Sequence, residues 1–540
     1  MEPQKDAPLQ LQETDDASGG GGDCCVASPC GWIVRLSHEL HWSFVIAVVA
    51  VYGACQGVGN AVGSVAAGYY WKDVQRVQPS AAQFYQGITG APWLVKTFWG
   101  LLTDVVPVAG FRRRPYFILA GVIGVPSMLM LSLNRGFGIM PALLALTAQS
   151  TGAAIADVTV DALVAQNSIT HPTLASDMQS LCGISSSVGA LLGFSISGLL
   201  VQSMGSQGAL GLLSIPAALV FLAGILLKEN RDTEFDYMQV HRKFYKAIQS
   251  MARTLKCPDV WRPCLYIFIS LNLSLDIQGG MFYWYTDHVV GPGFSETYGT
   301  FALVQGYIGL IYSIGAVGSI VGILLYQRGL KDYPFRNILF WSQVLSSLAG
   351  MLDVVLVTRL NLKIGIPDYF FAVIDYSTSQ MVDQFKWMPL VVLCSKLCPP
   401  GIEGTFYALL MSLQNAGLLL SAWWGGLLLH MLNVTRMEFS NLWIVVLIRN
   451  TVRLVPLVLL FLVPQCDQNS TLLPADMLQT SESTETVKTG PIEFSVDIGD
   501  DASCISHDVA VENEGIKMFD VETDDVELIP LVNKSGPNVS

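Results

Sequence analysis

The chain contains repeated apolar runs, each close to or longer than the ~20 residues that an α-helix needs to cross a bilayer. Only 14% of its 540 residues are charged and 51% are hydrophobic, whereas roughly a quarter of residues are charged in soluble domains. This composition excludes an ordinary soluble protein. It predicts an all-α, polytopic membrane protein.

Twelve apolar runs fall into two sets of six. The expected spans are 44–70, 83–102, 116–133, 140–165, 178–201 and 208–227, then 264–285, 298–326, 338–357, 369–394, 405–432 and 442–463. The expected parts of the chain are a disordered cytoplasmic tail (1–40), a six-helix bundle (41–228), a cytoplasmic linker (229–263), a second six-helix bundle (264–464) and an acidic, disordered cytoplasmic tail (465–540).

The distribution of lysine and arginine orients these spans. With both termini inside, the inner connections carry 15 Lys/Arg and the outer connections carry 6. Cytoplasmic loops are richer in basic residues, so we expect both termini to be cytoplasmic. The net charge of −13 comes from the last 76 residues, which hold 16 acidic and 3 basic side chains, and it therefore says nothing about the substrate.

Two segments recur at an offset of 228 residues: 189–200 aligns with 417–428, and 100–104 aligns with 328–332. Both matches fall at equivalent spans of the two sets. Two six-helix repeats with a long central linker resemble the major facilitator architecture, in which the substrate site lies between the halves near the membrane midplane.

A charged loop joins the second and third expected spans. Gly100 and Asp104 end the second span, and Arg112, Arg113 and Arg114 precede the third. An acid at a helix end facing arginines can form ion pairs in one state and lose them in another, so we predict a conformational switch. The alternative is that the arginines only anchor the loop on the cytoplasmic side.

Ionisable residues inside apolar runs are the main functional clue, because each is costly in hydrocarbon. Lys96 lies about midway along the second expected span, and Asp157 and Asp161 share one face of the fourth. Asp383 and Lys386 lie near the middle of the tenth. We predict that these residues bind substrate in a cavity. The alternative is internal salt bridges that fix helix positions, for example Lys96 with Asp157.

Further ionisable and aromatic groups lie on the seventh, tenth and twelfth expected spans. Asp276 is near mid-span, whereas Asp375 is shallower. Arg449 and Arg453 are four residues apart, and the deeper Arg453 is a predicted substrate-binding residue, with structural anchoring as the alternative. The aromatic run 282–285 is either an interfacial belt or a stacking wall for a flat heterocycle.

Two motifs carry a family resemblance. One is Pro92-Trp93-x-x-Lys96-x-x-x-Gly100-x-x-x-Asp104 followed by Pro107-x-x-Gly110-x-Arg112-Arg113-Arg114-Pro115-Tyr116, and the other is the segment 156–164, Ala-Asp-Val-Thr-Val-Asp-Ala-Leu-Val. Over about 44–464 the chain resembles plant-type members of the folate–biopterin transporter family, within the major facilitator superfamily.

The resemblance implies alternating-access transport of folates or pterins, coupled to protons. A carboxylate such as Asp157 or Asp383 would accept the adjacent N–H groups of a pterin, and Lys96, Lys386 or Arg453 would hold the glutamate tail of a folate. The open alternatives are another small organic anion, or a non-transporting receptor or scaffold on the same fold. We expect no enzyme activity, cofactor, metal or nucleic acid partner, because the sequence contains no HExxH, nucleophile motif or P-loop.

The last feature concerns location. Asp524, three further residues, then Leu528 and Ile529 form an acidic dileucine pattern, which predicts a sorting adaptor as partner; chance occurrence in an acidic tail is the alternative. The start of the sequence does not read as a transit peptide. We expect a plasma membrane or vacuolar/endosomal membrane rather than a plastid, with lipid around the spans.

Overall fold

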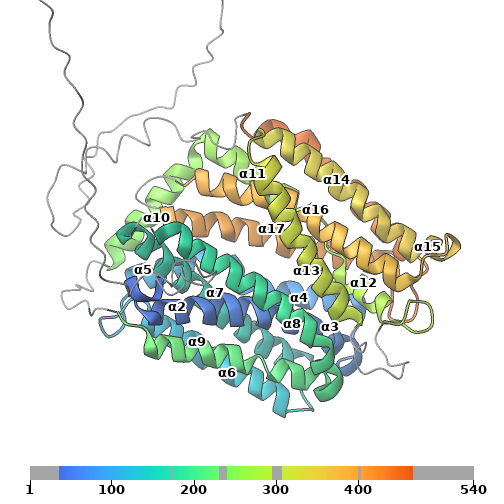
Figure 1. Cartoon of the computed structure of the whole chain (residues 1–540), viewed down its shortest axis with the longest axis horizontal. Coiled ribbons are helices and arrows are strands. Elements are labelled where there is room, and N and C mark those ends of the chain that lie inside the picture. The colour runs from blue at the N-terminus through green and yellow to red at the C-terminus, as the bar shows by residue number, and fades with distance from the viewer. Residues whose placement is uncertain are drawn as a thin grey trace, which may run out of the picture. The chain divides into compact units, whose positions relative to one another are not determined.

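A computed structural model of the chain describes residues 36–171, 174–229, 231, 240–294, 307–398 and 403–465 (Figure 1). Within these ranges the regular structure is helical, with one isolated β-bridge between Val108 and Phe111 in the loop before α6. The adaptor motif at Leu528 and Ile529 lies outside the described residues, as do most of both expected tails.

The helices of the first half precede the central linker, and those of the second half follow it. The first half contains α2 (Trp42–Val48), η1 (Val49–Gly59), α3 (Asn60–Tyr69), η2 (Tyr70–Val74), α4 (Pro79–Leu94), α5 (Lys96–Val105), α6 (Arg114–Leu133), α7 (Ile139–Thr170), α8 (Ala175–Gly211) and α9 (Ser214–Leu226). The linker helix α10 (Val240–Lys256) is followed by α11 (Pro258–Asn272), α12 (Gln278–Tyr285), α13 (Tyr307–Leu325), η5 (Tyr326–Leu330), α14 (Phe335–Val357), α15 (Leu360–Lys363), α16 (Asp368–Lys396), α17 (Glu403–Met431), α18 (Leu442–Val452) and η6 (Val455–Leu462).

Among the described helices, eight are long and apolar enough to cross a membrane. The other four expected spans also coincide with helices, but none of them is a single, long, uniformly apolar helix. The second and seventh are broken, α9 has only 13 residues, and α16 carries ionisable side chains along its 29 residues. The all-α membrane fold is confirmed, and the number of twelve crossings stays a prediction.

The boundary between the fifth and sixth expected spans falls inside α8. Gly205 there has a φ of +76°, a left-handed conformation that glycine adopts without a Cβ clash. The chain therefore turns at Gly205. Residues 208–211 belong to the sixth expected span, which continues into α9.

The break between α4 and α5 is anchored by α17. Pro92 lies inside α4, and α4 ends two residues later, at Leu94. The helical bond from Thr97 N–H to the Trp93 carbonyl is replaced by two contacts with α17. Thr97 N–H donates to Ser412 Oγ at 3.0 Å, and Asn415 Nδ2 donates to the Trp93 carbonyl at 3.2 Å. Polar side chains of a neighbouring helix thus satisfy backbone groups that lipid could not.

The break between α11 and α12 rests on the same helix. Leu275 has a φ of 44°, and the Asp276 N–H donates to Ser421 Oγ of α17 at 2.9 Å. A Cβ on Gly425 would lie 1.7 Å from the Asp276 carbonyl oxygen, so only glycine lets the backbones approach this closely. Helix α17 packs against α4, α5 and α11 (Figure 1), and it supports one broken helix from each half.

Each half also contains a close helix crossing at the repeated glycine segment. A Cβ on Gly189 of α8 would lie 2.2 Å from the Gly53 carbonyl oxygen and 3.0 Å from the Gly57 Cα of η1. A Cβ on the repeat partner, Gly417 of α17, would lie 3.0 Å from Leu271 Cβ of α11. Small residues allow such crossings in membranes. In each half, the glycine therefore sits against the first long helix of that half.

The two halves meet at the ends that the charge bias assigns to the outside. Lys72 Nζ donates to the carbonyl and hydroxyl oxygens of Thr286 at 2.8 and 2.5 Å. The Tyr283 hydroxyl donates to the Val77 carbonyl at 3.1 Å. In this structure the halves are joined on that side.

Candidate functional site

A charged cluster in the first half joins η1, α5 and α7. Lys96 Nζ lies 2.5 Å from Asp157 Oδ2 and 3.1 Å from Asp161 Oδ2. Gln56 Nε2 donates to Asp157 Oδ1 at 2.8 Å, and the Tyr52 hydroxyl donates to Asp161. The structure brings these three predicted residues together, and it adds Tyr52 and Gln56, whose uncharged side chains gave no signal in the sequence.

The side chains of this cluster differ in their exposure to solvent. The Lys96 and Asp157 side chains are 10% and 7% exposed, whereas that of Asp161 is 35% exposed. One ammonium group faces two carboxyl groups, so the cluster is electrically balanced only when one carboxyl carries a proton or a further cation approaches. The Lys96–Asp157 contact is the salt bridge expected if these residues only fix the positions of the helices. Such a salt bridge requires one carboxyl group, and Asp161 supplies a second.

The other three predicted residues form a separate cluster in the second half. Ser346 Oγ donates to Asp383 Oδ1 at 3.0 Å and lies 3.5 Å from Arg453 Nη1. Lys386 Nζ donates to the Ser270 carbonyl at 3.1 Å, and Arg453 Nε donates to the Ser274 carbonyl at 3.3 Å. In the part of the chain that the structure describes, no hydrogen bond or ion pair connects this cluster with Lys96.

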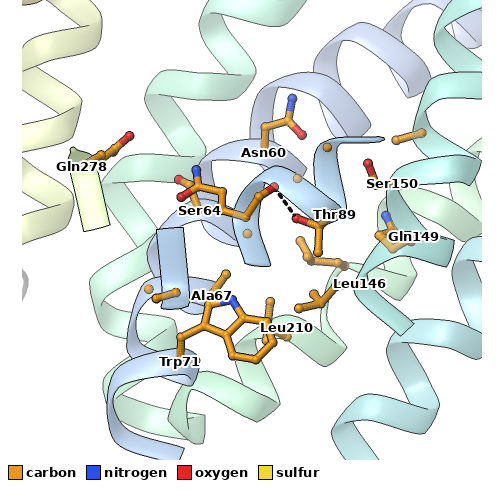
Figure 2. A pocket seen from close by; sticks show the side chains of 18 of the residues that line it. Asn60, Ser64, Ala67, Trp71, Thr89, Leu146, Gln149, Ser150, Leu210 and Gln278 are labelled. Carbon is orange, nitrogen blue, oxygen red and sulfur yellow. Dashed lines mark hydrogen bonds between the residues drawn. The ribbon is translucent and has the colours of Figure 1, made fainter. Parts of the chain in front are cut away.

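A cavity of about 450 Å³ lies beside the first cluster (Figure 2). Figure 2 shows Trp71, Gln149 and Gln278 on different sides of it. Both halves contribute to its wall. The aromatic lining residues are Trp71, Trp93, Phe282, Tyr283 and Tyr312, and the amide-bearing ones are Asn60, Gln86, Gln149 and Gln278.

None of the six predicted substrate-binding residues lines this cavity, but two lining residues adjoin them. The Trp93 ring centroid is 5.9 Å from Lys96 Nζ, and Cys55 precedes Gln56, which holds Asp157. The amides were missed because a glutamine in an apolar run carries no charge to mark it. Phe282 and Tyr283 are 5% and 0% exposed, which favours the stacking wall over the interfacial belt.

The predicted switch residues mostly make contacts within the first half. The Glu229 carboxylate, just after α9, accepts the backbone N–H groups of Arg112, Arg113 and Arg114 at 2.8 to 3.1 Å. Arg114 Nη2 donates to the Ile225 carbonyl near the end of α9 at 3.0 Å. A carboxylate at the start of α6 and a cation at the end of α9 both complement the helix dipoles.

Two other residues of this motif face different surroundings. A Cβ on Gly100 would lie 3.3 Å from Val158 of α7 and 3.7 Å from Ala408 of α17, so Gly100 lies where the two halves touch. Arg113 Nη1 donates to Thr103 Oγ1 at 3.0 Å. The side chain of Asp104 lies outside the described part of the structure.

A turn beyond α12 holds a carboxylate outside the membrane-spanning segments. Asp287 Oδ2 accepts the N–H groups of Val289, Val290 and Gly291 at 3.0, 2.6 and 3.2 Å. Burial alone raises the pKa of Asp287, but these N–H groups outweigh it and lower the pKa below its ordinary value. The turn is therefore stabilised by the ionised form.

The fold matches solved transporters. A D-xylose–proton symporter superposes with a TM-score of 0.57 at 12% identity, covering 81% of this chain and 100% of that one. A nucleoside transporter superposes with a TM-score of 0.55 at 13% identity, covering 78% and 98%. The shared fold is that of major facilitator transporters.

Sequence comparison gives nearer relatives. The "Probable folate-biopterin transporter 2" of Arabidopsis thaliana is 55% identical over 460 residues, which are 85% of this chain and 90% of that protein. The "Folate-biopterin transporter" of a Synechocystis strain is 32% identical over 436 residues, 80% and 84% of the two chains. Residues 56–477 match the BT1 family. The protein is a multi-pass membrane transporter with the major facilitator fold, and it belongs to the BT1 family.

Proposed function

We propose that this protein is a secondary active transporter that moves folate- or pterin-type organic anions by alternating access, coupled to protons. The observation that carries the proposal is the cavity of about 450 Å³ bordered by both halves and adjoining the Lys96 cluster. The names of the relatives, which refer to folate and biopterin, support the substrate class.

The cavity wall suits a flat heterocycle. Its volume falls within the roughly 300–1,000 Å³ typical of small-molecule sites. Aromatic side chains such as Trp71 and Trp93 provide stacking surfaces. The amides of Gln86, Gln149 and Gln278 each offer a donor and an acceptor, which is what the alternating edge of a pterin requires.

The charged clusters supply the remaining roles. Lys386 and Arg453 provide two cationic groups for the carboxylates of a glutamate tail, and Asp383 sets their local field. Lys96, Asp157 and Asp161 provide one carboxyl more than their cation balances, and we assign the transported proton to this cluster. Substrate and proton would then act on separate clusters, one in each half of the protein.

We place a conformational switch at the loop between α5 and α6. Gly100 contacts α17 across the halves, and the Glu229 and Arg114 contacts hold α6 to α9 as one unit. In the proposed mechanism, Asp104, Arg112 and Arg113 exchange partners as Gly100 slides past α17. The six-helix halves, 41–228 and 264–464, would move as the two rocking bodies.

The proposed orientation has both termini in the cytoplasm, supported by the excess of basic residues in the expected inner loops. We propose the plasma membrane or a vacuolar/endosomal membrane as the location, with the acidic pattern ending at Leu528 and Ile529 as a sorting signal. A fluorescent fusion compared with a Leu528→Ala/Ile529→Ala variant tests this, because loss of the signal should redistribute the protein. An unchanged distribution would exclude a sorting role for the pair.

Labelled-substrate counterflow tests the function. Proteoliposomes containing the full chain and loaded with unlabelled folate or biopterin should accumulate the labelled compound, whereas liposomes without protein should not. Competition by other organic anions then defines the specificity. A chain lacking residues 466–540 should transport as well as the full chain. The receptor or scaffold alternative holds if neither form transports substrate and only the full chain signals or binds partners.

A further inference from the structure

A second carboxyl pair lies in the second half, away from the Lys96 cluster. Asp353 of α14 accepts a hydrogen bond from Arg449 Nη2 of α18 at 2.6 Å, and their side chains are 14% and 11% exposed. Asp375 of α16 is 1% exposed, and its carboxyl is within hydrogen-bonding reach of the Asp353 carboxyl. The two carboxyl groups and the Arg449 guanidinium therefore lie together among α14, α16 and α18.

Asp375 receives no hydrogen bond from a protein donor in the part of the chain that the structure describes. An ionised carboxylate only accepts hydrogen bonds. Two ionised carboxylates in contact would repel each other, and burying an unpaired charge is costly. A proton held between Asp353 and Asp375 removes both problems, because it turns the contact into a hydrogen bond and leaves one negative charge opposite Arg449.

The charge count of the second half agrees with this. Its other membrane-embedded groups are Asp276, Asp383, Lys386 and Arg453, two acids and two cations. Arg449 and Asp353 add one cation and one acid, so the set remains neutral. Asp375 is then the one acid of this set that has no matching cation. We propose that Asp353 and Asp375 form a proton-binding site that holds one proton at neutral pH.

One tyrosine near the pair, Tyr285, also lies near a tyrosine that lines the cavity, Tyr312. The Tyr285 hydroxyl is close enough to Asp353, Asp375, Tyr312 and Tyr376 to interact electrostatically with all four. Tyr312, whose ring centroid lies 4.8 Å from that of Tyr376, lines the cavity. These hydroxyls can donate and accept hydrogen bonds, so they provide a route by which the cavity senses the proton on the pair.

The groups that face the pair are Arg449 of α18, Arg453 just after α18, and Tyr285 of α12. Loss of the proton adds a second negative charge beside the Asp353–Arg449 ion pair, and its return removes that charge. The existence of the site does not depend on the substrate. Its use in coupling rests on the proposed transport function.

Infrared difference spectroscopy of the full chain in lipid tests the site without any substrate. At neutral pH the wild-type protein should show a protonated-carboxyl C=O band that shifts on exchange into heavy water. Asp375→Asn should lower the intensity of that band, because only the part contributed by the Asp353–Asp375 pair disappears. Asp368→Asn is the matched control, because Asp368 lies on the same helix in an ion pair with Arg359, and it should keep the band.

Asp353→Asn is a second variant that tests the proposal even if Asp375→Asn does not fold. Asp375 would then face an amide and the guanidinium, and it would ionise. The contribution of the pair to the band should therefore again be lost. A band of unchanged intensity in both folded variants, or no band in the wild type, overturns the proposal. In proteoliposomes, Asp375→Asn should also reduce the acceleration of uptake by a pH gradient without abolishing it, because the transported proton is assigned to the Lys96 cluster. If the wild type transports no folate or pterin but shows the band as expected, the proton site stands and the proposed substrate fails.

Discussion

Lys96 Nζ lies 2.5 Å from Asp157 Oδ2, and Lys96 is the first residue of α5, directly after the break in the second expected span. A cation at a helix N-terminus opposes the helix dipole. The two carboxyls of α7 offset this unfavourable placement. The break, the lysine and the acids therefore form one arrangement, held against α17 by Ser412 and Asn415.

Removing the cation should destabilise the protein more than removing one acid. Lys96→Met leaves Asp157 and Asp161 facing each other without a counter-charge, and loss of one partner of a buried ion pair costs about 3–5 kcal/mol. Asp157→Asn leaves Lys96 paired with Asp161 and should cost less. Thermal unfolding in detergent measures the order, and a lower melting temperature for Asp157→Asn than for Lys96→Met would contradict it.

The glycine at the α8–η1 crossing should not accept a methyl group. Because a Cβ on Gly189 would meet the Gly53 carbonyl oxygen at 2.2 Å, Gly189→Ala should cost about 1–3 kcal/mol through forced backbone shifts. Gly183 lies on the same helix with no atom within 4 Å of its Cβ position, so Gly183→Ala should stabilise the helix by about 0.5–1 kcal/mol. Equal melting temperatures for the two variants would refute the tight crossing.

The turn after α12 should loosen in acid. The pKa of Asp287 is lowered in the folded protein, so its contribution to stability is fully present above the unfolded value of about 3.9 and is lost as the pH falls through the lower folded value. The protection of the Val290 and Gly291 amides against hydrogen exchange, measured relative to the intrinsic exchange rate at each pH, should therefore be high at neutral pH and fall in acid. In Asp287→Ala exchange should already be fast at neutral pH, and protection that is unaffected by the substitution would argue against this role.

A cavity-lining tryptophan should matter to aromatic substrates. Trp93→Leu keeps an apolar side chain but removes the ring, and stacking is worth about 0.5–1.5 kcal/mol beyond area burial, so substrate affinity should fall roughly 2- to 10-fold. The matched control is Trp341→Leu, because Trp341 is 67% exposed on α14. Binding isotherms for biopterin compare the two, and equal affinities would remove Trp93 from the site.

Charge in apolar sequence was a reliable guide to local contacts. Lys96, Asp157 and Asp161 could be grouped from the sequence because hydrocarbon makes each costly unless it is paired, and helix spacing put the two acids on one face. The same reasoning could not predict that Asp383, Lys386 and Arg453 form a separate cluster. Their grouping depends on Ser346 and on backbone carbonyls of α11 and the segment that follows it.

The neutral parts of the site left no such signal. Gln86, Gln149 and Gln278 line the cavity, but glutamine in an apolar run is common and its direction depends on tertiary packing. The role of α17 was also hidden, because Ser412 and Ser421 act only where another helix breaks beside them. Similarly, the link between Glu229 and the loop before α6 joins residues more than 110 positions apart.

Substrate protection of a cysteine placed in the cavity tests the central claim most directly. In proteoliposomes, Gln86→Cys should react with a membrane-permeable thiol reagent, and saturating folate or biopterin should slow that reaction, as quantified by mass spectrometry at residue 86. Gly136→Cys, in an open loop with no atom within 4 Å of its Cβ position, should react at the same rate with and without substrate. Equal labelling of Gln86→Cys with and without a transported substrate would contradict the account, because the cavity would then not be where the substrate binds.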